Sequence, residues 1–95
     1  MKCCAGVMTV TLHLPHSHSL KERRSVVNSV KERVRNKCNV SIHEEAGEGW
    51  QICNLAVACV ADTESHVEHQ FRTVREIMEQ DTRLILLNPK IEYYV

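Results

Sequence analysis

Hydrophobic and polar residues alternate along the first part of the chain. In residues 5–14 (AGVMTVTLHL), every second side chain from Met8 to Leu14 is large and apolar, and threonines and His13 fill positions between them. A period of two places one kind of side chain on each face of a strand, so these residues predict a half-buried β-strand. Pro15 ends the pattern, and a short loop is expected to follow it.

The pattern becomes helical at Ser19. Ser19 and Glu22 form an S-x-x-E capping box, which predicts a helix that begins near Leu20. At about 100° per residue, one arc of this helix is apolar and is expected to face the core. The arc consists of Leu20, Val26, Val27, Val30 and Val34. The helix is expected to run to about Lys37 and to stop at Asn39, because asparagine tolerates the left-handed conformation that closes many helices.

A β-hairpin is predicted next. Residues 40–43 and 50–61 alternate between apolar and other side chains, and a glycine-containing turn separates them. Cys53 and Cys59 share the apolar face of the second strand and are expected in the core as small hydrophobic residues. Trp50 opens that strand, where it favours a core or interface anchor over a stacking platform for a base.

A second helix and a last strand complete the predicted fold. The helix is expected to start at residues 62–64 and to bury a stripe that includes Phe71. Residues 83–95 predict a strand, in which Pro89 favours an edge position or a bulge because it has no N–H to donate. The sequence therefore predicts a two-layer α/β sandwich of order βαββαβ, with a four-stranded antiparallel sheet and two helices on one face, as a single domain over residues 1–95.

Charge is balanced in total but not along the chain. Twelve Lys and Arg match twelve Asp and Glu, yet residues 1–40 hold eight basic and two acidic side chains. In the first helix, Lys21, Arg24, Asn28, Lys31 and Arg35 follow one another at steps of three or four, and the four cations among them form what we call the basic ridge. The ridge consists of Lys21, Arg24, Lys31 and Arg35. The second helix instead offers oppositely charged pairs at i,i+4, namely Glu68–Arg72, Arg72–Glu76 and Arg75–Glu79.

The basic ridge predicts a nucleic-acid contact, although a solvated helix face is an equally good interpretation. Contacts of three or four cations with phosphates would give weak, salt-dependent binding. The predicted open face of the sheet carries residues such as Thr9, Thr11 and Asn54, and not the stacking aromatic residues that sheets use to read RNA bases. Binding to the RNA backbone by a helix is therefore expected.

Composition disfavours metal binding and catalysis. The five cysteines include no C-x-x-C pair and no secretion signal precedes them, so they are interpreted as reduced thiols of a cytoplasmic protein with no membrane span. The sequence leaves open whether His13, His16 and His18 bind a metal or an anion, and we predict no metal site and no cofactor. No phosphate-binding glycine loop, nucleophile elbow or H-E-x-x-H motif is present, so a non-enzymatic protein is expected.

Several stretches of the sequence resemble those of a known family. Residues 19–42 (SLKERRSVVNSVKERVRNKCNVSI), preceded by TLHLP and followed by WQICNLAVACVAD, resemble the YlxP-like family of small bacterial proteins. The resemblance implies a ferredoxin-like fold, a cytoplasmic location and a gene encoded beside translation initiation and ribosome maturation factors. The chain departs from the family pattern at His16, His18 and Cys38, and its hairpin turn is shorter.

Three functions remain open. The first is a non-enzymatic accessory protein that binds ribosomal or other structured RNA through the basic ridge. The second is a homo-oligomeric interaction module, in which the uncharged open sheet face, with Ile52, Asn54, Ala56 and Ala58, pairs between copies. The third, less favoured, is a sensor that binds a small anion at the start of the first helix near Ser19.

Overall fold

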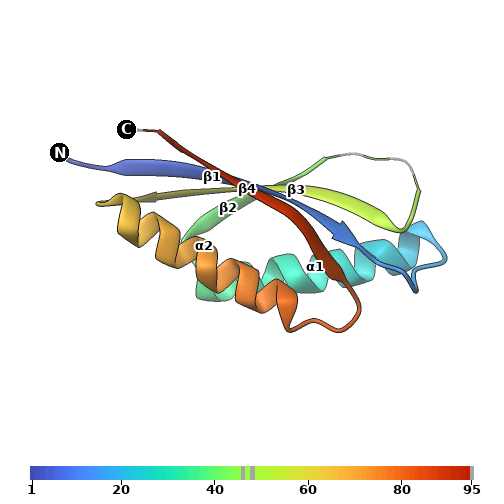
Figure 1. The fold of residues 1–95 in the computed structure, drawn as a ribbon. Helices are drawn as coiled ribbons and strands as arrows, with labels where there is room; N and C mark the ends of the chain where they lie inside the picture. The colour runs from blue at the N-terminus through green and yellow to red at the C-terminus, as the bar shows by residue number, and fades with distance from the viewer. Residues whose placement is uncertain (46, 48, 95) are drawn as a thin grey trace.

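The structure is a computed structural model and describes residues 1–45, 47 and 49–94. Six elements follow one another as predicted, in the order βαββαβ. They are β1 (Cys4–His13), α1 (Leu20–Lys37), β2 (Val40–Glu44), β3 (Ile52–Ala61), α2 (Glu64–Glu79) and β4 (Ile85–Tyr94). Both helices lie under the same face of the sheet, which leaves the opposite face uncovered by them (Figure 1).

All neighbouring strands of the sheet are antiparallel, and their order is β2-β3-β1-β4. β1 lies at the centre and pairs with β3 along its whole length, from Cys4 opposite Ala61 to His13 opposite Ile52. The short β2 and the long β4 are the two edges. The predicted four-stranded sheet with helices on one face is thus confirmed.

The edge strand β4 contains a bulge at the predicted proline. The register between β1 and β4 shifts after Thr9, which lies opposite Lys90, so that Thr11 lies opposite Leu87. Asn88 adopts a left-handed conformation with φ of 51°, which asparagine tolerates better than most residues. The bulge and the edge position accommodate Pro89, because neither requires its missing N–H.

The core lies between the sheet and the helices. Met8 and Leu12 of β1, Val57 of β3 and Phe71 of α2 are fully buried there. Cys53 and Cys59 are buried as predicted; burial, and then the nearby Glu44 carboxylate, raises the pKa of the Cys53 thiol to about 11. None of the helices in the described residues has the length and apolar character needed to cross a membrane.

Helix α1 begins near Leu20 and ends at Lys37 as predicted, but its C-terminal cap differs from the prediction. The Ser19 hydroxyl accepts a hydrogen bond from the Glu22 amide at 3.1 Å, and the Glu22 carboxylate accepts one from the His18 amide at 2.6 Å. At the other end, the cap is Cys38 in an extended conformation, with φ of −126°. The Asn39 amide donates to Gln70 of α2 at 2.9 Å. The left-handed stop predicted at Asn39 was therefore wrong, because the chain passes directly into β2.

Candidate nucleic-acid interface

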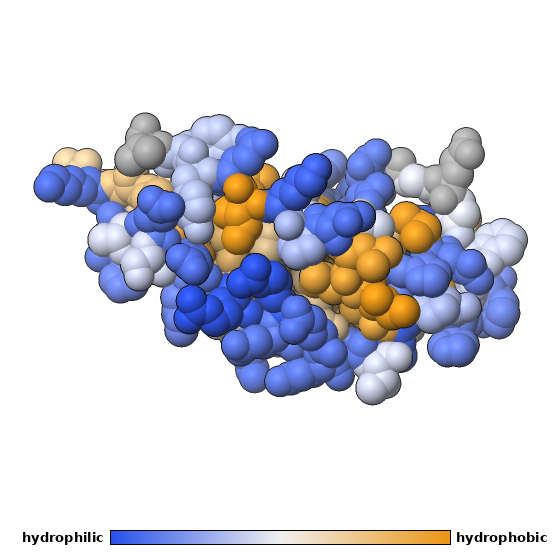
Figure 2. All heavy atoms as spheres, viewed as in Figure 1, coloured by the Kyte–Doolittle hydropathy of each residue, from blue (hydrophilic) through white to orange (hydrophobic). Residues whose placement is uncertain are grey.

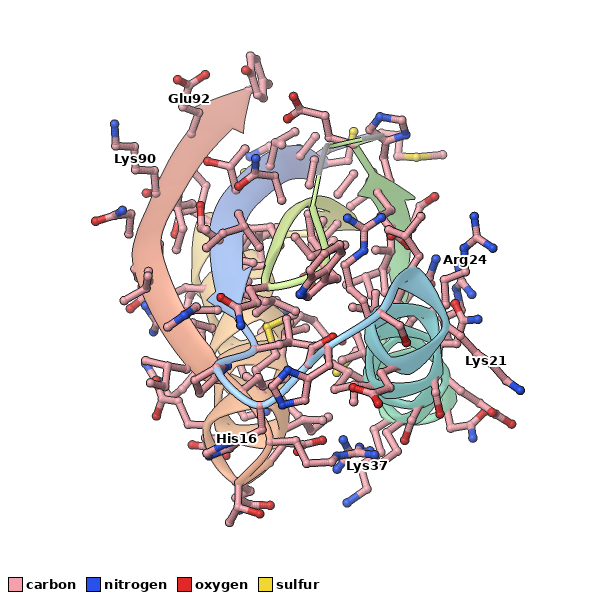
Figure 3. The ribbon with its side chains drawn as sticks, turned by 90° about the vertical axis from the view of Figure 1, so that its right-hand side faces the viewer. His16, Lys21, Arg24, Lys37, Lys90 and Glu92 are labelled. Atoms are coloured by element: carbon pink, nitrogen blue, oxygen red, sulfur yellow. The ribbon has the colours of Figure 1, made fainter. Side chains whose placement is uncertain are left out.

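The basic ridge lies on the flank of α1 that points away from α2. Figure 3 shows Lys21 and Arg24 extending outward from this flank, on the side of the molecule opposite β4. Lys21, Arg24 and Arg35 are exposed, and none of the three forms an ion pair with another described residue. At a rise of about 1.5 Å per residue, Lys21 and Arg35 lie roughly 21 Å apart along the helix.

Lys31, the fourth residue of the ridge, is not free. Its Nζ donates to the Glu44 carboxylate at 3.1 Å, and the two side chains are only 17% and 22% exposed. Helical spacing within α1 could not reveal this pair, because Glu44 comes from the end of β2. The structure therefore reduces the exposed cationic part of the ridge to Lys21, Arg24 and Arg35.

Arg23 is a structural residue that sequence periodicity missed. Its guanidinium donates to the Gly49 carbonyl at 2.8 Å and lies 3.9 Å from the Glu44 carboxylate, and its Nε has no hydrogen-bond partner among the described residues. Arg23 is 7% exposed, whereas Leu20, predicted in the core-facing arc, is 44% exposed. Arg23 lies on the same helical arc as Val27 and Val30, which was the available signal.

Further hydrogen bonds attach the β2–β3 connection to the connection between β1 and α1. The Leu14 amide donates to the Gln51 carbonyl at 2.7 Å, and the Gln51 side-chain amide donates to the Ser17 carbonyl at 3.3 Å. Trp50 lies between these anchored residues, outside β3, and is 45% exposed. The predicted place of Trp50 in the strand was wrong, and the ring is not a core anchor.

The other flank of α1 is occupied by internal contacts. Asp81, whose side chain is 4% exposed, contacts both Arg33 of α1 and Arg83, which lies before β4. Hydrogen bonds from Arg83, and then from Arg33, hold the pKa of the Asp81 carboxyl well below its usual range against the opposing effect of burial. Arg33 thus joins α1 to the α2–β4 connection and is unsuited to bind an external anion.

On α2, one of the three predicted charge pairs forms. Arg72 lies 3.5 Å from Glu68, while the Arg72–Glu76 and Arg75–Glu79 pairs, all within the described residues, do not come within 4.0 Å. Acidic and basic side chains still alternate on this helix. The contrast with the exposed side of α1, where Lys21, Arg24 and Arg35 gather, is therefore retained in the structure.

The start of α1 is already occupied by a side chain of its own. The Glu22 carboxylate accepts from the His18 amide, and Arg23 turns away toward Gly49. An external anion near Ser19 would have to compete with Glu22 at this helix end. His16 lines a small hollow of about 280 Å³ with Glu22 and Arg83, and within the described residues no three His, Cys, Asp or Glu side chains converge as metal ligands would.

The prediction that the open face of the sheet is uncharged was wrong, because β4 contributes Lys90 and Glu92 to it. The face combines apolar ends with a polar middle. Ile52, Ile85 and Leu87 are exposed near one end, and Val60 and Tyr94 near the other. Figure 2 shows apolar side chains gathered along the course of β4. The middle of the face is a trough of about 810 Å³. Across the middle of this trough, four residues of neighbouring strands lie side by side: Lys90 of β4, Thr9 of β1, Ala56 of β3 and His43 of β2.

Comparison with known proteins identifies the family. Residues 5–91 match a family described as a protein of unknown function, DUF503. The chain belongs to this family. No curated protein matches the chain.

Two designed proteins of known structure share the fold of this DUF503 protein. The de novo designed protein Foldit4 is 16% identical, with a TM-score of 0.53 and 97% of each chain covered. The de novo designed LFR1 1, described as having a ferredoxin fold, is 15% identical with a TM-score of 0.52, over 96% of this chain and 85% of the other. These similarities show that the chain has a ferredoxin-like fold.

Proposed function

We propose that this DUF503 protein is a non-enzymatic accessory protein that binds structured RNA through α1. The observation that carries the proposal is the exposure of Lys21, Arg24 and Arg35 along about 21 Å of one helix, without an ion-pair partner among the described residues. Exposed cations that form no ion pair within the protein are the groups that RNA phosphates neutralise. The YlxP-like resemblance, with its implied genes for translation factors, agrees with a ribosomal RNA as the partner.

The mode of binding would be electrostatic and dependent on RNA shape. A straight row of cations can follow one phosphate backbone of an A-form helix, whose deep and narrow major groove prevents side chains from reading its bases. Lys31 would support this surface indirectly. Its pair with Glu44 joins α1 to the end of β2 and neutralises the Glu44 carboxylate. Three phosphate contacts would give modest affinity, which a large RNA could increase through additional contacts elsewhere.

Charge reversal tests this proposal. The triple variant Lys21→Glu, Arg24→Glu and Arg35→Glu should lose most binding to ribosomal subunits in a co-sedimentation assay at low salt. A matched control reverses three exposed cations elsewhere, namely Lys2, Arg72 and Lys90, and changes the net charge equally. The control should retain binding. Equal losses in the two variants would show that net charge, and not the surface of α1, determines binding.

A second function is favoured by a separate observation. The exposed apolar residues of the open sheet face, including Ile85, Leu87 and Val60, fit self-association better than contact with RNA phosphates. Three strands about 33 Å long and the shorter β2, about 17 Å long, lie about 4.8 Å apart and present roughly 550 Å² in projection. This area approaches the roughly 800 Å² that each partner of a stable complex buries. A homodimer through this face would leave α1 free and would double the cationic surface offered to RNA.

A further inference from the structure

The strongest unexplained feature outside the ridge and the open face is Trp50. It is the one tryptophan of the chain and remains 45% exposed, although a ring of this size usually contributes to a core or an interface. A hollow of about 380 Å³ lies beside it, lined by Gly49, Trp50, Gln51 and Ile52. The structure thus presents a large aromatic surface next to a space that a planar group could enter.

The backbone on either side of Trp50 is anchored. The Gly49 carbonyl accepts from Arg23 at 2.8 Å, and the Gln51 carbonyl accepts from the Leu14 amide at 2.7 Å. The side chain of Gln51 adds bonds to the carbonyls of Pro15 and Ser17 at 3.4 and 3.3 Å. Anchors on both neighbours hold the backbone at Trp50, so a ligand that stacks on the ring would lose little free energy to ordering of the backbone there.

The charges nearby suit a nucleic acid. Arg23 joins Gly49 to the first turn of α1, so Trp50 lies at the end of the helix that carries the exposed Lys21 and Arg24, both directed outward in Figure 3. The Glu44 carboxylate of this region contacts both Arg23 and Lys31, so its charge is compensated within the protein. Single-stranded nucleic acids bind with bases stacked on aromatic rings and phosphates on cations. An RNA strand that stacks on Trp50 would continue around this end of α1 to reach Lys21 and Arg24.

We infer that Trp50 is a stacking site for an unpaired RNA base, positioned so that the adjoining phosphates contact Lys21 and Arg24. This inference rests on the proposed RNA function and specifies its target: a helical RNA with a single-stranded bulge, loop or end at this point. Stacking is tolerant of sequence because every base has an aromatic face. The protein would therefore favour a junction between paired and unpaired RNA and would not select a particular base.

The single tryptophan makes stacking directly measurable. Titration of the protein with a single-stranded RNA of about 12 nucleotides should quench the Trp50 fluorescence, and a blunt duplex of the same length should quench it much less. In anisotropy measurements with labelled RNA, Trp50→Ala should weaken single-strand binding by about 5- to 150-fold, which corresponds to 1–3 kcal/mol for one stacked base. Binding of the duplex should change little.

Two substitutions distinguish stacking from a general apolar contact. Trp50→Phe keeps an aromatic ring and should retain most of the binding, whereas Trp50→Leu keeps apolar character without a ring and should behave like Trp50→Ala. Equal losses in the Phe and Leu variants would overturn the inference, because an aromatic ring would then offer no advantage over an apolar side chain. Tyr94→Ala, which removes an exposed aromatic ring at the other end of the sheet, is the matched control and should bind normally.

The outcomes also separate this inference from the proposed function. If the charge-reversed α1 variant loses RNA but Trp50→Ala binds normally and wild-type fluorescence is unchanged, the ridge stands and stacking is wrong. If neither the single strand nor the duplex binds the wild-type protein at low salt, both proposals are wrong. Quenching that is lost with Lys21→Glu and Arg24→Glu would support both together.

Discussion

Asp81 is the residue whose surroundings most clearly contribute to stability. Its carboxylate is nearly inaccessible to solvent, and it accepts hydrogen bonds from the side chains of Arg33 and Arg83 and from the Arg83 amide. These contacts connect α1, the end of α2 and the start of β4. A buried charge with several donors stabilises a fold chiefly because removal of one partner leaves the others unsatisfied.

Asp81→Asn should lower the free energy of unfolding by about 1.5–3 kcal/mol at neutral pH, the usual loss for hydrogen bonds to a charged group. Because folding lowers the pKa of Asp81, its contribution is complete above about pH 4, near the pKa of a free aspartate, and declines as the pH falls further. Urea denaturation of both proteins between about pH 2 and 7 measures this difference.

The difference between wild type and Asp81→Asn should therefore shrink below about pH 4. Asp62→Asn is the matched control, since Asp62 is exposed and contacts only His66 among ion-pair partners in the described residues; its effect should stay within about 0.5 kcal/mol. A wild-type advantage over Asp81→Asn that stays constant down to about pH 2 would contradict the assigned role.

Individual residues also show what sequence patterns reveal. Helical spacing correctly placed Lys21, Arg24 and Arg35 on an exposed flank, because periodicity fixes which side chains share a face. It could not show that Lys31 would meet Glu44, since that pair depends on how α1 packs against β2. Arg23 was missed for a related reason: its long side chain is buried beneath the hairpin, where backbone carbonyls accept its hydrogen bonds.

At the level of elements, α2 lies close against β1 at Gly6. A Cβ atom at this position would lie 2.7 Å from Cγ1 of Val67 and 2.9 Å from Cε2 of Phe71. Both side chains are fully buried and have little room to move in a close-packed core. Glycine at this position thus allows the helix to lie directly on the central strand.

Gly6→Ala should destabilise the protein by about 1–3 kcal/mol, the usual range for an overpacked core, as measured by chemical denaturation. Gly47→Ala is the control, because its added Cβ would have a nearest neighbour only at 4.0 Å and should change the free energy of unfolding by no more than about 0.5 kcal/mol. Similar stabilities of Gly6→Ala and wild type would mean that α2 can shift without cost.

The elements were predictable where their signals are local. The start of α1 follows from Ser19 and Glu22, and the bulge of β4 from Pro89, because capping and the missing N–H act within a few residues. The last residue of α1, Lys37, was predicted, but the conformation that follows it was not, because Asn39 is held by Gln70 of α2. The start of β3 was displaced because contacts with Arg23 and Leu14 hold residues 49–51 outside the strand.

At the level of the whole molecule, the open sheet face makes a prediction about oligomeric state. The protein should behave in light scattering as a dimer of the 10.9 kDa chain, and the dimer should persist at high salt because apolar contacts are not screened. Ile85→Lys with Leu87→Lys should give monomers. The control is Leu20→Lys, which changes an exposed apolar residue of α1; this variant should remain dimeric. If the wild-type protein is a monomer at all concentrations, the second function is refuted.

The central claim is that the exposed cations of α1 bind RNA phosphates, and salt dependence tests it most directly. Affinity of the wild-type protein for an RNA duplex, measured at several monovalent salt concentrations, should give a slope of log K against log salt of about −2 to −3, the value for about three phosphate contacts. Lys21→Glu, Arg24→Glu and Arg35→Glu together should abolish this slope. Binding that is independent of salt, or a wild-type slope that the triple variant retains, would contradict the account.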